Sequence, residues 1–204
     1  MRLAKPLVFV AALCPLALLV FKVLTGRTSA NPAEDIILTT GIWAFRFLLV
    51  TLAITPVRRL TGWNRVIQYR RMFGLFAFFY AITHLLSYIA FDRFFAFGEV
   101  FADIAKRPFI TAGMAAFALM VPLAMTSTRG WIRRLGRRWQ LLHRLVYLSA
   151  IAAALHFIWK VKVVIGEPIY YAAILAVLLG FRLVWRLWAM RRQPGIAPSR
   201  PSAR

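Results

Sequence analysis

The chain has 204 residues, of which 61% are hydrophobic and 16% charged, and its mean hydropathy of +0.69 lies well above that of water-soluble domains. Lys and Arg number 27 against 6 Asp and Glu, giving a net charge of +21. Nucleic-acid-binding proteins carry such a charge on one soluble face, whereas here the basic residues separate long apolar segments. Composition therefore excludes a soluble domain and a nucleic-acid partner, and it predicts a small polytopic protein of the lipid bilayer.

A membrane-spanning helix needs about 20 apolar residues, and six apolar segments are long enough to form one. They cover residues 7–24, 36–55, 72–91, 109–125, 139–159 and 169–190. Arg182 and Arg186 interrupt the last segment, so we expect both to snorkel to the interface, with five spans as the alternative. The first segment resembles a signal peptide but is too long and lacks a clear cleavage site. The predicted fold is an all-α polytopic helix bundle of about six transmembrane helices.

Basic loops predict the orientation, because Lys and Arg accumulate on the cytoplasmic side. The N-terminus, residues 56–71, residues 126–144 and the chain from Arg182 onward together hold nineteen Lys and Arg and no acid. All six acids lie in the other loops or beside them. We therefore predict that both termini are cytoplasmic. For most of the arginines, setting this topology and contacting lipid headgroups is a sufficient explanation.

The three histidines, His84, His143 and His156, all fall inside predicted membrane segments, while Cys14 offers neither a disulfide nor a CxxCH haem attachment. Intramembrane ionisable side chains usually face the bundle interior and mark a functional path. Imidazole is also a common axial ligand of haem iron. The alternative is that each histidine only bonds between helices. Three histidines on two helices favour the haem interpretation.

Their spacing predicts two depths in the membrane. His84 lies 13 residues beyond Arg71 and His156 lies 18 beyond Arg138, so both are expected in the outer half. His143 lies 5 residues beyond Arg138, about 20 Å below His156 along an ideal helix. The same helix places these two histidines about 140° apart in azimuth, on different faces. Two depths suggest two redox centres.

Several local motifs together resemble the MsrQ (YedZ) family. They are LAITPVRR at 52–59, RRMFGL at 70–75, THLLSY at 83–88, LAMTS at 123–127, WQLLHRLVY at 139–147 and HFIW at 156–159. The resemblance covers about residues 36–188. This family provides the haem-binding membrane subunit of a bacterial periplasmic methionine sulfoxide reductase system. It belongs with the ferric reductase-like transmembrane domains, which include the membrane part of NADPH oxidases.

The resemblance implies a protein of the bacterial inner membrane that holds one or two haem b groups and is associated with FMN. It would take electrons from the quinone pool, or from a cytoplasmic flavin reductase, and pass them to MsrP, a periplasmic molybdopterin enzyme that repairs methionine sulfoxide in oxidised proteins. His84 and His156 match the outer ligand pair and His143 matches the inner ligand. The implied organisation is a first helix with a periplasmic loop (1–35), a haem-binding domain (36–190) and a disordered basic tail (191–204).

One position departs from the oxidase pattern. Arg70 stands 14 residues before His84, where the oxidases have a fourth histidine, and an arginine cannot coordinate iron. The inner haem would then be five-coordinate, use another ligand or be replaced by a flavin. Arg70, Arg71 and Arg144 either pair with haem propionates or an FMN phosphate, or only set the topology. Arg46 falls in the middle of a segment, and we expect it to face the interior and a propionate.

The expected role is therefore electron transfer without substrate chemistry in this chain. Stand-alone ferric or quinone reduction is one alternative, and a membrane transporter or assembly factor without haem is another. The acidic loop at 92–107 is the expected docking site for MsrP, because it is the longest outward loop.

Overall fold

A computed structural model describes residues 4–160 and 166–191, and every regular element within these ranges is helical. Six helical spans are long and apolar enough to cross a membrane, which confirms the all-α polytopic fold and favours six spans over five. The predicted disordered tail, apart from Arg191, lies outside the described residues. The spans are α1 (Ala4–Leu24), α2 (Pro32–Thr61), the segment Asn64–Asp92, α5 (Pro108–Met125), the segment Arg137–Lys160 and α9 (Glu167–Arg191).

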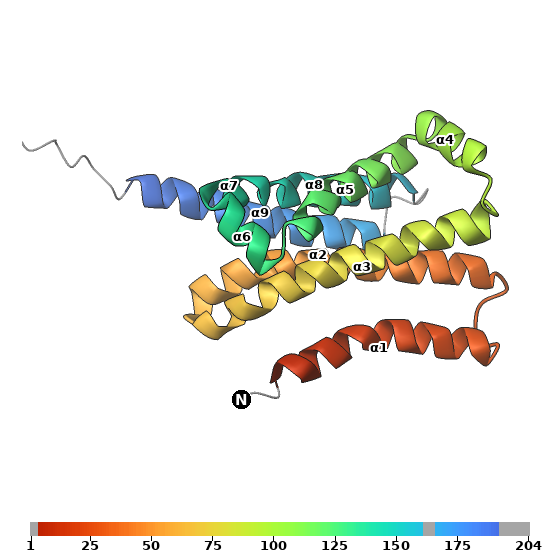
Figure 1. Ribbon diagram of the computed structural model, residues 1–204, viewed down its shortest axis with the longest axis horizontal. Helices are drawn as coiled ribbons and strands as arrows, with labels where there is room; N and C mark the ends of the chain where they lie inside the picture. Colours follow the sequence, from red (N-terminus) through yellow and green to blue (C-terminus); the bar gives the residue numbers. More distant parts are fainter. Residues whose placement is uncertain (1–3, 161–165, 192–204) are drawn as a thin grey trace, which may run out of the picture.

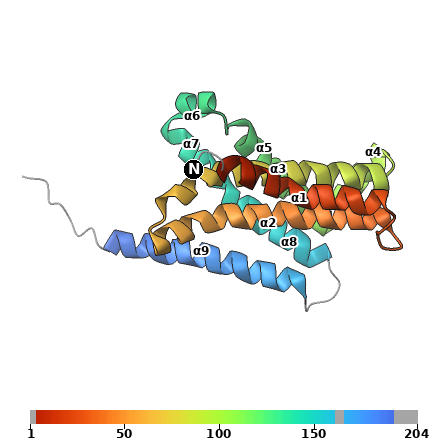
Figure 2. The same cartoon turned by 90° about the horizontal axis from the view of Figure 1, so that it is seen from below.

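The remaining elements complete or join these spans. They are η1 (Asn64–Tyr69), α3 (Arg70–Ser87), η2 (Tyr88–Asp92), α4 (Phe97–Lys106), α6 (Arg129–Leu135), α7 (Arg137–Leu142) and α8 (Leu145–Lys160). The long helices alternate in direction (Figure 1). Helix α2 packs along α3 and α5 packs along α8, while α9 contacts α2 and α8, and α1 contacts α2 at the edge (Figure 2). The start of α1 and the end of α9 lie at the same end of the bundle (Figure 1). Which end is cytoplasmic stays a prediction.

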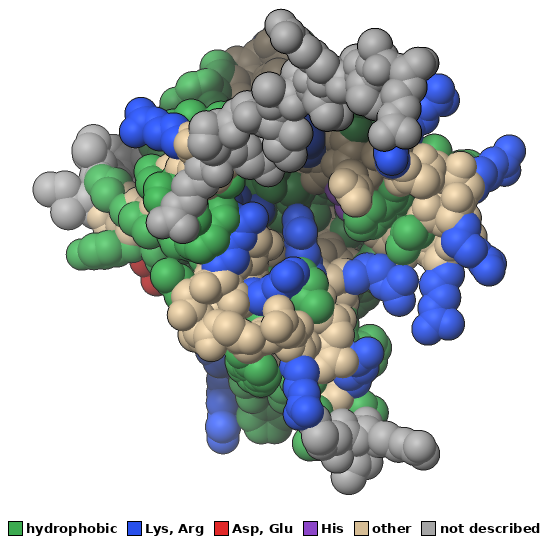
Figure 3. Space-filling model, turned by 90° about the vertical axis from the view of Figure 1, so that its left-hand side faces the viewer, with side chains coloured by type: hydrophobic (Ala, Val, Ile, Leu, Met, Phe, Trp, Pro, Cys, Tyr) green, Lys and Arg blue, Asp and Glu red, His purple; other side chains and the backbone are tan. Residues whose placement is uncertain are grey.

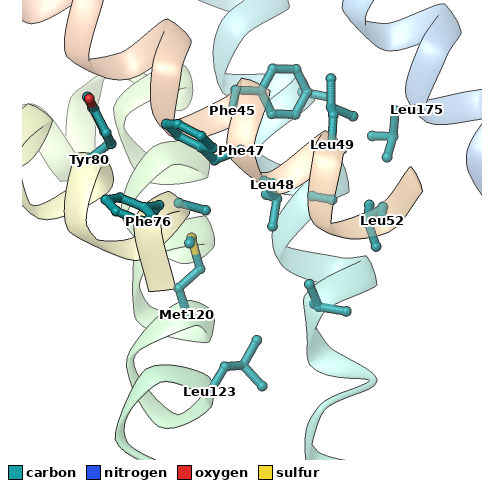
Figure 4. Packing of buried hydrophobic residues seen from close by; sticks show 14 of the residues in the cluster. Phe45, Phe47, Leu48, Leu49, Leu52, Phe76, Tyr80, Met120, Leu123 and Leu175 are labelled. Atoms are coloured by element: carbon teal, nitrogen blue, oxygen red, sulfur yellow. The ribbon is translucent and has the colours of Figure 1, made fainter. Parts of the chain in front are cut away.

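Small side chains allow the close packing of the two helix pairs. Ala77 on α3 and Ala150 on α8 are completely buried. Beside Ala150, the Ser149 hydroxyl donates to the Ala116 carbonyl of α5 at 3.0 Å. Small residues and hydroxyl groups drive helix association in membranes, where the hydrophobic effect offers little. The large side chains of the core come from α2, α3, α5 and α9. Those labelled in Figure 4 are Phe45, Phe47, Leu48, Leu49, Leu52, Phe76, Tyr80, Met120, Leu123 and Leu175.

A tyrosine of α3 enters the backbone ladder of α1. Pro15 interrupts α1 because it has no N–H to donate. Next to it, the hydroxyl of Tyr80 donates to the Ala12 carbonyl at 3.0 Å and accepts from the Leu16 N–H at 3.2 Å. An uninterrupted helix would join these two groups directly. Tyr80 is 1% exposed, so this bridge attaches α1 to the bundle through a buried contact.

Arg182 donates a hydrogen bond to the Leu52 carbonyl, which has no helical N–H donor because a proline stands four residues later. Pro56 lies inside α2 and cannot donate to Leu52, four residues earlier. Arg182 of α9 donates to that Leu52 carbonyl and, through its other terminal nitrogen, to the Tyr147 hydroxyl at 2.7 Å. The expectation that Arg182 snorkels to the interface was therefore wrong. An unsatisfied carbonyl in a membrane costs several kcal/mol, which favours the inward orientation. Arg186 is exposed, as expected.

The fifth predicted span is not one continuous α-helix. Helix α7 ends at Leu142 and α8 begins at Leu145, so His143 and Arg144 form a turn between them. The depth and azimuth predicted from an ideal helix through His143 therefore do not apply. Lys and Arg side chains gather on this end of the molecule, which Figure 3 shows as hollowed at its centre. The partition of basic and acidic loops read from the sequence thus corresponds to two ends of one bundle.

Candidate functional site

His84 and His156 lie side by side although they are far apart in sequence. His84 is near the end of α3 and His156 is near the end of α8. The centroids of the two imidazole rings are 6.0 Å apart and the ring planes make an angle of 72°. Both side chains line one cavity of about 470 Å³, within the size range of cofactor sites. The structure thus brings together the two histidines that the sequence analysis assigned to the outer half.

Each of these imidazoles is bound by a backbone carbonyl through Nδ1. His84 Nδ1 lies 2.9 Å from the Ile37 carbonyl oxygen, and His156 Nδ1 lies 2.6 Å from that of Phe109. A carbonyl only accepts, so each Nδ1 carries the proton and donates it. The neutral tautomer then leaves Nε2 unprotonated, with its lone pair free. A second partner of this kind fixes the tautomer and orientation of metal-binding histidines.

Two glycines provide the space for these rings. A Cβ atom at Gly41 would lie 3.0 Å from His84 Nδ1, and one at Gly113 would lie 2.7 Å from His156 Nδ1. Side-chain atoms at such distances would force the imidazoles to move. Gly41 lies one turn after Ile37 on α2, and Gly113 lies one turn after Phe109 on α5. The same stretch of helix therefore holds the imidazole and leaves room for it.

The two halves of the cavity are lined by a repeated sequence pattern. Most residues of α2 and α3 that line the cavity beside His84 have a counterpart 72 positions later in α5 and α8, the pair that holds His156. The cavity lining follows the same register. The matching lining residues are Ile37 with Phe109, Leu38 with Ile110, Gly41 with Gly113, Ile42 with Met114, Ala44 with Ala116, Phe45 with Phe117, Leu48 with Met120, Ala81 with Ala153, His84 with His156, Leu85 with Phe157, and Tyr88 with Lys160. The two helix pairs run in the same direction (Figure 1), so this is a parallel repeat whose halves face each other across the cavity.

His143 does not join this cavity. Its ring stacks on Trp139 with a centroid distance of 3.8 Å, and its Nδ1 lies 3.1 Å from the Trp139 carbonyl oxygen. Its Nε2 is buried and has no hydrogen-bond partner among the described residues. Arg70 is half-buried and acts electrostatically on His143, whereas Arg71 is exposed. Arg144, in the turn beside His143, is also exposed.

Arg46 lies on a different side of α2 from the residues that line the cavity. Its Nε donates to the Tyr171 hydroxyl of α9 at 2.7 Å, and its guanidinium lies over the Trp43 ring, 4.8 Å from the centroid. Phe45, its neighbour, does line the cavity and contacts the Tyr171 ring at 6.0 Å. Arg46 thus sits one aromatic layer away from the cavity. Its predicted contact with a propionate stays a prediction.

Helix α4 covers the end of the cavity away from the arginine cluster. Val100 and Ile104 of α4 line the cavity. Asp103 anchors the helix, because it accepts from Arg93 at 2.6 Å, from Arg107 at 3.0 Å and from the Tyr88 hydroxyl at 2.6 Å. The hydrogen bond to Tyr88 contributes most to a raised pKa of Arg93, which keeps this side chain charged. The predicted docking loop therefore contains a helix whose acidic residues are partly engaged in ion pairs.

Sequence reasoning missed the groups that position the histidines. The carbonyls of Ile37 and Phe109 carry no side-chain signal, and Gly41 and Gly113 are common residues in membrane helices. The recurrence of Ile-x₃-Gly and Phe-x₃-Gly, each 43 residues from Gly to His, was the available signal. Within the described residues, no three His, Cys, Asp or Glu side chains come together to hold a bare metal ion.

Comparison with known families identifies the class of this bundle. The family described as "Ferric reductase like transmembrane component" matches residues 40–154, which include most of α2, all of α3 and α5, and most of α8. The helix bundle with its paired histidines thus belongs to the class of ferric reductase-like transmembrane proteins. No solved structure matches the chain.

Full-length relatives narrow this class further. The proteins named "Protein-methionine-sulfoxide reductase heme-binding subunit MsrQ" from Xanthomonas euvesicatoria pv. vesicatoria and Rhodospirillum rubrum are 50% and 51% identical to it. The alignments cover 98% and 97% of this chain, and 94% and 95% of those relatives. The protein of the same name from Herminiimonas arsenicoxydans is 49% identical over 94% of this chain and 88% of its own length. The chain belongs to the MsrQ family.

Proposed function

We propose that this protein is the haem b electron-transfer subunit of a methionine sulfoxide reductase system, and that His84 and His156 coordinate its haem iron. The observation that carries the proposal is the matched construction of the two histidines. Each has its Nδ1 committed to a carbonyl and its Nε2 free, and both line the same cavity. His84 and His156 would hold the haem iron, because each offers an unprotonated ring nitrogen to a metal ion.

The spacing of the rings fits this role. His84 and His156 would be able to hold one iron ion between them, because their ring centroids lie close together. The measured separation is 6.0 Å. The repeat in the lining also suits a flat ligand with two similar faces, because each face meets an equivalent helix pair. When bound, haem supplies reversible one-electron chemistry at its iron.

The chain's own residues would hold and insulate this group. The Ile37 and Phe109 carbonyls orient the two imidazoles, and aromatic side chains such as Phe45 and Phe117 exclude water from the cavity walls. Lys160 and Arg107 line the same cavity and offer cations for the two carboxylates of haem. Arg46 would reach these carboxylates only if its hydrogen bond to the Tyr171 hydroxyl were broken.

Membership of the MsrQ family supports a proposal for electron flow across the membrane. We propose that electrons enter from the quinone pool, or from a cytoplasmic flavin reductase, and leave to MsrP in the periplasm. The relatives' name supports a partner in methionine sulfoxide reduction, and the six apolar helices support a membrane location, proposed to be the bacterial inner membrane. We further propose that His143 serves a second, inner centre, either a second haem b or FMN, with Arg70, Arg71 and Arg144 near it. The loop around α4 would dock MsrP.

The test is a dithionite-reduced minus oxidised absorption spectrum with haem counted per chain. The wild type is compared with His84→Ala, His156→Ala and His143→Ala. We expect the first two variants to lose the same haem, and the third to keep it. A colourless wild type after haem supplementation would overturn the proposal. Full haem and full electron delivery to MsrP in the triple histidine variant would overturn it as well.

A further inference from the structure

Three buried polar atoms lack a hydrogen-bond partner in the part of the chain that the structure describes. They are Thr55 Oγ1 on α2, His143 Nε2 in the turn before α8, and Arg182 Nε on α9. Buried polar groups are paired in most proteins, and an unpaired donor in a membrane costs several kcal/mol. Three such atoms on three neighbouring segments therefore point to a ligand with which they pair.

Arg182 connects the segments that carry the other two atoms. Its terminal nitrogens donate to the Leu52 carbonyl and to the Tyr147 hydroxyl. Thr55 lies one turn after Leu52, and Tyr147 lies one turn after His143. The guanidinium therefore lies between the turns that carry Thr55 and His143. Its two terminal nitrogens have structural partners, whereas its Nε–H remains available.

Thr55 differs from three other threonines of its helix. The hydroxyls of Thr40, Thr51 and Thr61 each donate to the carbonyl four residues earlier, at 2.7, 2.8 and 2.8 Å. This local bond is the usual way for a helical threonine to satisfy its hydroxyl in an apolar environment. The Thr55 hydroxyl makes no such bond and is nevertheless buried. Its rotamer leaves the hydroxyl free for another acceptor.

The charge around these atoms specifies the kind of acceptor. Arg70 acts electrostatically on both His143 and Arg182, so two guanidinium groups lie near one another. The sequence has no Asp or Glu between residues 36 and 91 or between residues 104 and 166, so these loops and helices supply no counter-charge. Figure 3 shows Lys and Arg side chains around the hollow at this end. Intramembrane cations pair with acidic side chains or with backbone carbonyls. The terminal nitrogens of Arg182 have a carbonyl and a hydroxyl as partners, whereas its Nε–H has no partner among the described residues.

We propose that Arg182 Nε–H and the Thr55 hydroxyl bind the anionic group of a second cofactor that lies against His143. The ligand class is a carboxylate or a phosphate on an aromatic redox cofactor, as on a haem or a flavin mononucleotide. The Nδ1 proton of His143 is held by the Trp139 carbonyl, which leaves its buried Nε2 unprotonated and without a hydrogen-bond partner in the described part of the chain. This inference rests on the proposed function. It adds α9, which lies beyond the matched region 40–154, to the inner site.

The experiment counts haem and released FMN per chain in purified full-length protein. Thr55→Val keeps the side-chain shape and removes the hydroxyl, with Thr51→Val as its matched control. Arg182→Gln is made together with Pro56→Ala, which returns a backbone donor to Leu52, with Arg186→Gln as the control for charge on α9. Thermal melting identifies variants that merely unfold. Loss of a charge-assisted hydrogen bond is expected to weaken retention of the second cofactor by on the order of tenfold.

Each outcome decides a different point. A fall from two haems to one in Thr55→Val and in the Arg182 variant supports a carboxylate ligand, and loss of FMN with unchanged haem supports a phosphate ligand. Unchanged haem and unchanged FMN in both variants would overturn the inference and assign ordered water to these atoms. The outer haem provides the separation from the proposed function. If His84→Ala removes one haem while Thr55→Val removes nothing, only this inference fails.

Discussion

The imidazoles of His84 and His156 are held in the same way, each by a carbonyl 47 residues earlier in the chain. Equal spacing on two separate helix pairs means that the two ligands are positioned by the same local geometry. The glycine one turn after each carbonyl completes that geometry. The site therefore depends on backbone positions as much as on the histidines themselves.

Substitution of the glycines should disturb the cavity in a graded way. A Cβ at position 113 would lie 2.7 Å from His156 Nδ1, and one at position 41 would lie 3.0 Å from His84 Nδ1. We expect Gly113→Ala to lose more haem per chain than Gly41→Ala, because the first contact is the shorter. Gly180→Ala is the control, since no atom lies within 4 Å of a Cβ there. Equal haem content in all three variants would contradict the model of the site.

Removal of the Tyr80 hydroxyl should loosen α1. Tyr80→Phe leaves the Ala12 carbonyl and the Leu16 N–H without their buried bridge, at a cost of about 1–3 kcal/mol. We expect a lower melting temperature and earlier protease cleavage of α1 in detergent. Tyr170→Phe, at a side chain 68% exposed, should change neither. If the two variants behave alike, the Tyr80 bridge does not anchor α1.

The contact between Arg182 and Leu52 should depend on Pro56. In the native sequence Arg182→Gln leaves the Leu52 carbonyl without a donor, and we expect a loss of about 1–3 kcal/mol. In a Pro56→Ala background the residue at position 56 can donate to that carbonyl, so the same substitution should cost less. Denaturant unfolding of the two single variants and the double variant gives the coupling energy. Additive effects would show that Arg182 does not compensate for the proline.

The ion pair between Arg93 and Asp103 should hold helix α4 to the bundle over a wide pH range. The pKa of Arg93 is raised above its usual value, chiefly by the hydrogen bond to Tyr88, so its contribution is fully present below the unfolded-state pKa and declines only as pH rises beyond it. We expect proteolysis of the segment around α4 to be equal at about pH 6 and about pH 9. Arg93→Gln should increase cleavage at both, with Lys106→Gln as the control. A pH-dependent difference in the wild type would mean that another group holds α4.

Much of this organisation could be predicted from the sequence, because apolar length and the positions of basic loops are properties of local composition. The six spans and the shared depth of His84 and His156 follow from them, whereas the assignment of these histidines as a pair came from the family resemblance. The turn at His143 could not be predicted, since the apolar run continues through it. The inward direction of Arg182 was also missed, because it depends on a carbonyl freed by a proline 126 positions earlier. Contacts between distant helices leave little trace in the periodicity of either one.

The repeat also has a consequence for assembly. A chain with one helix pair and one histidine would need a second copy, related by a two-fold axis, to enclose the same cavity. Joining both pairs in one polypeptide removes that requirement and lets the halves diverge. The register places His143 opposite Arg71, and Tyr80 opposite Ala152. Around His84 and His156 the halves remain equivalent, whereas toward the arginine-rich end each half carries a different chemistry, which a symmetric dimer would be unable to encode.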